Sequence, residues 1–161
     1  MASIRQLCMV CIAFSIPALV AQDAIPAWCR ALPRRENVGL VRVITGGWFE
    51  VYRVAPGVFA IYEPHQSEET ISYLIVGQTK ALLFDTGMGI GNIQHATAEL
   101  TRLPIVVLNS HTHVDHVGGN WQFDTILAMD ADFTPANARG SREAAQAEIA
   151  PGETCGERFR P

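Results

Sequence analysis

The chain has no run of lysine or arginine, and its formal net charge of −4 over 161 residues is modest. A phosphate backbone binds clusters of basic side chains, so we expect no nucleic-acid partner. The apolar run at residues 7–16 is shorter than the roughly twenty residues that a membrane-spanning helix needs. With 48% hydrophobic and 17% charged residues, the sequence predicts one globular domain with a single core.

The first residues follow the order of a secretory signal. Arg5 precedes the apolar run, Pro17 breaks it, and small residues end at Ala21. This order predicts a signal peptide over residues 1–21, with cleavage near Ala21 or, as an alternative, near Ala24. We therefore expect a secreted or periplasmic protein with no stable membrane insertion after cleavage. An uncleaved membrane anchor is the alternative.

Cysteine is scarce, and two of the four cysteines, Cys8 and Cys11, fall in the predicted signal. Cys29 and Cys155 remain, and an oxidising compartment would allow them to pair, although the sequence leaves the pairing open. Cys155 has no second cysteine or histidine near it, which favours an isolated surface thiol over a zinc ligand. Prolines and clustered charge predict an exposed lead-in over residues 22–38.

Aromatic and β-branched residues around turn residues predict four successive strands, and ordered structure is expected to begin near Gly39. The expected strands are residues 48–54, 58–62, 71–76 and 79–84. Short turns separate the members of each pair, so the sequence predicts a meandering antiparallel sheet. The apolar density of the fourth strand predicts that both its faces are covered.

A βαβ unit is predicted next. Helical spacing runs from about Asn92 to Arg102 and ends before Pro104, and residues 105–108 read as a short buried strand. Loops at the carboxyl ends of such strands are where α/β sheets place their chemistry. Further on, a short strand is expected at residues 125–128 and a helix at residues 141–150.

Four potential metal ligands follow the strand at 105–108 within six residues: His111, His113, Asp115 and His116. In an extended loop the first three side chains leave the same side, whereas His116 points elsewhere unless the loop curls. The pattern suggests two adjacent sites, one begun by His111 and His113 and the other by Asp115 and His116.

Gly118 and Gly119 would give the backbone the freedom that a tight curl needs. His65 and His95 have no potential ligands beside them in the sequence, so neither is expected to bind metal.

Residues 110–120 read SHTHVDHVGGN and residues 83–87 read LFDTG. These motifs resemble the metallo-β-lactamase superfamily, and the resemblance extends over about residues 39–130. It implies an α/β fold that is half of an αβ/βα sandwich, with a mixed sheet and flanking helices. The N-terminal half of that domain would occupy residues 39–135, followed by a helix and irregular tail at 136–161.

The resemblance also implies roles for particular residues. His111 and His113 would bind a first metal, and Asp115 and His116 a second. Asp85 would brace the metal loop from behind, although an ordinary turn aspartate is an equal alternative. The implied cofactor is zinc, as one or two ions.

The implied activity is that of a zinc-dependent hydrolase acting on a small-molecule substrate. Metal-bound hydroxide would attack an ester, lactone, lactam or related bond, with Asp115 as the catalytic group that orients the nucleophile and relays its proton. A mononuclear iron dioxygenase-like protein of the same fold is one alternative. A non-catalytic, truncated metal-binding remnant is another.

The chain departs from the family pattern because no histidine follows His116. The family completes its sites with a later His, a bridging Asp and a last His, whereas Asp130 and Asp132 read here as loop residues. We therefore interpret the chain as a fragment of a longer hydrolase with an incomplete site. A truncated gene product, or a second chain that supplies the missing ligands, are the alternatives.

Overall fold

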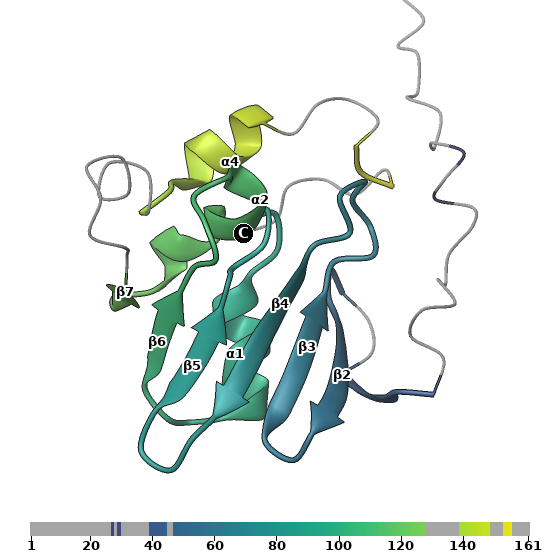
Figure 1. Ribbon diagram of the computed structural model, residues 1–161. Helices are drawn as coiled ribbons and strands as arrows, with labels where there is room; N and C mark the ends of the chain where they lie inside the picture. Colours follow the sequence, from purple (N-terminus) through teal and green to yellow (C-terminus); the bar gives the residue numbers. More distant parts are fainter. Residues whose placement is uncertain are drawn as a thin grey trace, which may run out of the picture.

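Seven strands form one mixed sheet, and strands that are consecutive in the chain lie side by side (Figure 1). The computed structural model describes residues 27, 29, 39–44, 47–127, 139–148 and 153–155. The predicted signal peptide lies outside these residues, as do most of the predicted lead-in, Asp130 and Asp132. No helix within the described ranges has the length and apolar character to cross a membrane.

The predicted meander is confirmed. The strands are β1 (Val41–Ile44), β2 (Glu50–Ala55), β3 (Val58–Tyr62), β4 (Ile71–Val76), β5 (Ala81–Phe84), β6 (Ile105–Leu108) and β7 (Ile126–Leu127). Pairing is antiparallel from β1 to β5 and parallel from β5 through β6 to β7. Short turns suffice for the antiparallel steps, whereas the parallel step from β5 to β6 needs a crossover.

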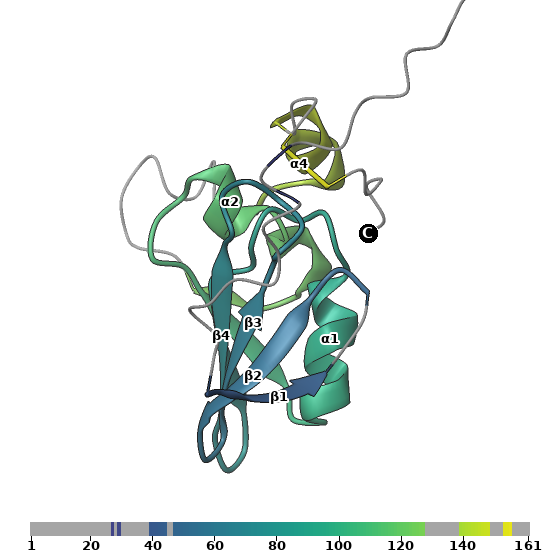
Figure 2. The same ribbon diagram turned by 90° about the vertical axis from the view of Figure 1, so that its right-hand side faces the viewer.

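Helix α1 (Ile93–Leu100) makes that crossover, which confirms the predicted βαβ unit. The side chain of Asn92 accepts a hydrogen bond of 2.8 Å from the backbone N–H of His95 and so caps the helix at its start. Ile93 and Ala96 are buried against one face of the sheet, beside which α1 lies in Figure 2.

The core lies between α1 and this face. Alternate residues of the central strands point into it, so Leu74, Leu83 and Val107 have no exposed surface. The buried cluster is Phe49, Val51, Ile61, Leu74, Ala81, Leu83, Ile93, Ala96, Val107 and Phe123.

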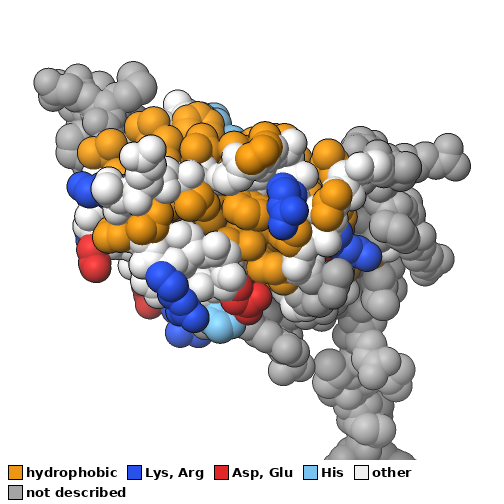
Figure 3. Space-filling model, turned by 90° about the horizontal axis from the view of Figure 1, so that it is seen from below, with side chains coloured by type: hydrophobic (Ala, Val, Ile, Leu, Met, Phe, Trp, Pro, Cys, Tyr) orange, Lys and Arg blue, Asp and Glu red, His pale blue; other side chains and the backbone are white. Residues whose placement is uncertain are grey.

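No described helix covers the centre of the other sheet face (Figures 1 and 2). On β4, Ile71, Tyr73 and Ile75 are 37–42% exposed. The expectation that β5 is covered on both faces is therefore wrong, because its outward residues Leu82 and Phe84 are only half-buried. Figure 3 shows hydrophobic side chains over much of the molecule seen from below, the view opposite the metal loop.

Three short helical segments follow β6: α2 (Val114–Val117), η3 (Asn120–Gln122) and α4 (Arg142–Glu148). Figure 1 shows α2 and α4 together above the upper ends of β5 and β6. The predicted C-terminal helix is thus confirmed, and the Ser141 hydroxyl caps it by accepting a 2.9 Å hydrogen bond from the Ala144 N–H.

Cys29 and Cys155 form a disulfide with a Cα–Cα distance of 5.5 Å. The interpretation of Cys155 as an isolated thiol is therefore wrong. Residues 153–155 lie along the loop between β3 and β4, where the Cys155 N–H donates to the His65 carbonyl at 2.9 Å and the Ser67 N–H to the Glu153 carbonyl at 2.8 Å. The bridge ties Cys29 to this loop.

Candidate metal centre

The loop that follows β6 meets the end of β5 because parallel strands end at the same edge of a sheet. The Asp85 N–H, directly after β5, donates to the Leu108 carbonyl at 3.0 Å. Residues 85–91 and 109–120 consequently lie against each other at this edge, and the predicted metal loop is part of the second segment.

His111, His113 and Asp115 each offer a ligand atom, and these atoms lie within 4.8 Å of one another. The two imidazole rings are exposed and meet edge to face with centroids 4.6 Å apart, while Asp115 is half-buried. Two imidazoles and one carboxylate are donors that suit zinc, and three protein ligands are what catalytic zinc sites carry. The residues present therefore fit a divalent cation.

The predicted side-chain directions assumed an extended loop, but the loop is extended through only part of its length. Residues from Val114 onward form the single helical turn of α2, in which the N–H groups of His116 and Val117 both donate to the His113 carbonyl. The turn carries His116 back, so that its ring centroid lies 4.0 Å from that of His111.

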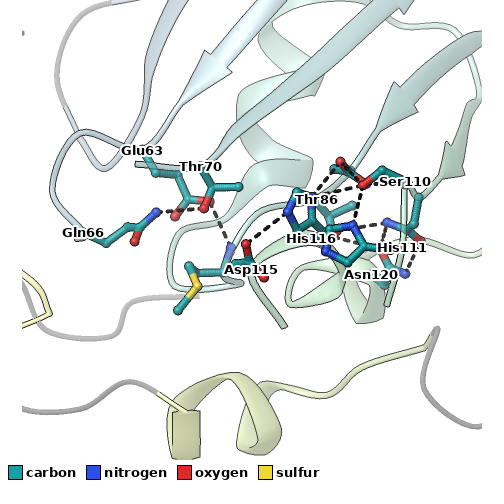
Figure 4. Close-up of polar contacts among 12 residues, drawn as sticks. Glu63, Gln66, Thr70, Thr86, Ser110, His111, Asp115, His116 and Asn120 are labelled. Carbon is teal, nitrogen blue, oxygen red and sulfur yellow. Dashed lines mark hydrogen bonds and ion pairs between the residues drawn. The ribbon is translucent and has the colours of Figure 1, made fainter. Parts of the chain in front are cut away.

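His116 contacts a carboxylate through each of its ring nitrogens (Figure 4). Its Nδ1 lies 2.8 Å from Oδ2 of Asp85 and its Nε2 lies 3.0 Å from Oδ2 of Asp115. Nε2 therefore faces Asp115 of the metal group, while Nδ1 is held by Asp85 on the opposite side of the ring. An imidazole held in this way is the arrangement that orients metal ligands in proteins.

The two glycines after α2 are required for a different reason from the predicted one. Gly118 has φ −56° and Gly119 has φ −92°, which any residue can adopt. A Cβ at Gly118, however, would lie 2.3 Å from the backbone of Met88, and one at Gly119 would lie 2.6 Å from the Thr86 carbonyl. Glycine thus permits a close approach of the two segments rather than a strained curl.

Asp85 is 3% exposed and has φ 62°, a value that is costly for a residue with a side chain. Its Oδ1 accepts a 2.7 Å hydrogen bond from the Ser110 N–H, and its Oδ2 one of 2.9 Å from the Ser110 hydroxyl. The same hydroxyl lies 2.9 Å from Nδ1 of His111. Ser110, to which the sequence gave no role, therefore links Asp85 to the metal loop.

Replacing Ser110 with alanine is expected to lower zinc affinity by about 10-fold to 100-fold, because an orienting contact of two histidines is lost. Competition against a chromophoric chelator measures this, with Ser67→Ala, an exposed serine outside the centre, as the control. Ser110→Thr, which keeps a hydroxyl, should restore most of the affinity. Equal affinities for Ser110→Ala and the wild-type protein would contradict the role.

A second group that the sequence did not predict surrounds the backbone carbonyl of His116. This carbonyl accepts hydrogen bonds from the Thr86 N–H at 2.9 Å and from the Asn109 amide at 3.0 Å. Asn120, which is fully buried, donates to Asn109 Oδ1 at 2.7 Å and lies 2.7 Å from the Thr86 hydroxyl. The signal for this network in the sequence was that Thr86 and Asn120 lie within the two quoted motifs and that Asn109 directly precedes the second.

Glu63 is the other residue that the sequence did not single out. It is 2% exposed, and its carboxylate accepts hydrogen bonds from the Trp48 indole at 2.7 Å and from the Met88 N–H at 3.1 Å. Burial raises the pKa of Glu63 to about 7; these hydrogen bonds lower it and the charge of Asp115 raises it further. Figure 4 shows Glu63 on the side of the site where Asp115 lies.

The remaining histidines lie apart from the centre. His95 is exposed on α1 and lies 3.2 Å from Glu99, and His65 packs its ring against Trp48. Neither belongs to the metal-ligating group found among the residues that the structure describes.

A pocket of about 490 Å³ opens beside the metal group, between α2 and α4. Its lining residues are Thr112, His113, Val114, Asp115, Val117, Gly118, Gly140, Ser141, Ala144 and Ala145. Two members of the metal group thus form part of its wall.

Residues 69–129 match the family model described as the metallo-beta-lactamase superfamily. Over 107 residues the chain is 26% identical to the human acyl-coenzyme A thioesterase MBLAC2. The aligned part covers 58% of this chain and 38% of that protein. The chain therefore spans well under half the length of this relative.

Two solved structures are also similar. A metallo-beta-lactamase from Erythrobacter litoralis has a TM-score of 0.43 and 19% identity, over 49% of this chain and 39% of that one. TMB-1 has a TM-score of 0.36 and 20% identity, over 48% and 38%. The matched residues, 69–129, contain the whole metal group together with Asp85.

Proposed function

We propose that this chain forms the metal-binding part of a zinc-dependent hydrolase, in which His111, His113 and Asp115 hold a zinc ion. The observation that carries the proposal is the convergence of their three ligand atoms within 4.8 Å. A zinc ion bound there would supply Lewis acidity and lower the pKa of a water molecule that it binds. A second ion, if present, would use Nε2 of His116 together with Asp115.

Asp115 is the one carboxylate of the group, so we assign it the proton that an attacking water must lose. Its Oδ2 is oriented by Nε2 of His116, at 3.0 Å, and His116 is in turn oriented by the buried Asp85. This series of contacts fixes the direction of the Asp115 carboxylate before any substrate binds, which reduces the cost of ordering it during the reaction.

An acyl thioester is the first substrate class to test, because the human relative is named as an acyl-coenzyme A thioesterase. Esters, lactones and lactams present a similar carbonyl to a nucleophile, and they complete the set of candidate small-molecule substrates. Export to an oxidising compartment, secreted or periplasmic, is part of the proposal and is supported by the Cys29–Cys155 bridge.

Metal binding without turnover is the second candidate function. It is favoured by a sheet face on which Ile71, Tyr73 and Ile75 are exposed. A C-terminal half or a second chain would then be needed to complete the site.

The test is to strip the purified chain with a chelator, titrate it with zinc, and assay a panel of an acyl thioester, an aryl ester, a lactone and a β-lactam. Zinc-dependent hydrolysis of one panel member is expected, and it should disappear when the chelator returns. Zinc binding without any turnover would support the second candidate. Failure to bind zinc, or preferential binding of iron with oxygen uptake, would contradict both.

A further inference from the structure

The pocket between α2 and α4 has apolar side walls, which binding of a metal ion does not require. These walls are formed by Val114 and Val117 of α2 and by Ala144 and Ala145 of α4. Among the residues that the structure describes, Asp115 is the only charged side chain that lines it, and none of these lining residues is a lysine or arginine. A ligand group that carried negative charge would find no counter-ion there, so the walls suit a neutral aliphatic group.

Helix α4 is held against the metal loop by contacts between small residues. Ala145 has no exposed surface, and a Cβ at Gly89 would lie 3.1 Å from the Ala145 Cβ. At the start of the helix, a Cβ at Gly140 would lie 2.8 Å from the Val117 carbonyl. The Gly140 contact sets the distance between the start of α4 and α2, and hence the width of the pocket, while the Gly89 contact holds α4 against residues 85–91.

The pocket begins at the metal group, where the reacting bond would lie. His113 and Asp115 belong to the metal group and line the pocket as well. A carbonyl that reacts at the metal group can therefore place its own substituent between α2 and α4. The volume, about 490 Å³, lies within the range that small-molecule sites occupy.

We propose that this pocket binds the acyl chain of the substrate, and that the substrate is an ester or thioester of a short, uncharged aliphatic acid. The proposal rests on the proposed function, since it identifies which part of a hydrolysed acyl compound lies on which side of the metal group. Ala144 is then a specificity-determining residue, because it is the exposed wall residue whose enlargement would fill the pocket.

The experiment compares Ala144→Trp with Ala147→Trp, the same change at an exposed residue of the same helix that does not line the pocket. The zinc-loaded chain is assayed with p-nitrophenyl acetate, butyrate and hexanoate. In the wild-type protein kcat/KM should rise about threefold to fourfold for each methylene buried. Ala144→Trp should remove this rise with chain length, whereas Ala147→Trp should keep it.

Binding of hexanamide, a neutral compound that cannot act as an ester substrate, gives a second measurement that needs no turnover. Calorimetry on the chelator-treated chain should detect binding by the wild-type protein and by Ala147→Trp, and its loss in Ala144→Trp. If none of the three esters is hydrolysed, this measurement alone decides whether the pocket binds an aliphatic group. An equal loss for all three esters in Ala144→Trp, or no hexanamide binding by the wild-type protein, would overturn the proposal.

Discussion

Replacing His113 with alanine is expected to lower zinc affinity by more than about 100-fold and to abolish any zinc-dependent hydrolysis. The expected loss is larger than the 10-fold to 100-fold that orienting residues contribute, because His113 supplies one of the three converging ligand atoms. Its side chain makes no capping hydrogen bond to α2, which is held by the His113 backbone carbonyl instead. The fold should therefore survive, and the effect should appear in zinc affinity and in the hydrolysis that depends on zinc.

His95→Ala is the matched control, because His95 is exposed on α1 and lies outside the metal group. A competitive titration of zinc against a fluorescent chelator should separate the two variants, while their circular dichroism spectra and unfolding midpoints stay close to those of the wild-type protein. If His113→Ala bound zinc as tightly as His95→Ala does, the three-ligand centre would be wrong.

Replacing Glu63 with glutamine is expected to remove a large pH dependence of stability. The pKa of Glu63 is raised to about 7 from 4.5, mainly because its carboxyl group is buried. Ionisation is thus less favourable in the folded chain than in the unfolded chain. The stability that the neutral carboxyl contributes is fully present below about pH 4.5 and is lost as the pH rises through about 7.

The size of this loss follows from the pKa difference and is about 3 kcal/mol of unfolding free energy. The glutamine side chain does not titrate, and its amide can accept from only one of the two donors, the Trp48 indole and the Met88 N–H. At about pH 5, Glu63→Gln should consequently have an unfolding free energy roughly 1–3 kcal/mol lower than that of the wild-type protein, because one buried donor is unsatisfied. Near pH 8 the two unfolding free energies should become equal or change order, because the wild-type protein has lost the stability of its neutral carboxyl group.

Urea unfolding of the chelator-treated chain at several pH values between about 5 and 8 measures the difference between variant and wild-type protein. Chelator treatment matters because a bound cation would offset the Asp115 charge that faces Glu63. Glu68→Gln, the same change at an exposed position of the same loop, should leave the pH profile unaltered. Parallel profiles for Glu63→Gln and the wild-type protein would show that Glu63 does not titrate in this range.

The parts of the fold that local patterns encode could be predicted. Residues 71–76 and 105–108 form strands where alternation or apolar density predicted them, and α1 begins where Asn92 can cap it. The metal loop was found for the same reason, because its four potential ligands are concentrated within six residues. Such patterns are carried by neighbours in the chain, so they need no knowledge of the tertiary structure.

The contacts that hold the site were not predictable in this way. Glu63 lies 25 residues from Met88, and its position in a polar stretch of sequence gave no sign of burial. The prediction for Gly118 gave the wrong reason, because the close approach of Met88 depends on two segments far apart in the chain. The pairing of Cys29 with Cys155 was left open for the same reason, since the two lie 126 residues apart in the chain.

The sequence by itself determined the family motif, the order of strands β2 to β7 with helix α1, and the residue types at the candidate metal centre, because each depends on spacing along the chain. It predicted neither β1 nor the helical turn of α2. Tertiary structure alone decided that the ring of His116 lies between Asp85 and Asp115, that Ser110 links Asp85 to the metal loop, and that α4 closes a pocket beside the metal group. The physical reason is that burial and distance are properties of packing, and packing joins segments that the sequence keeps apart.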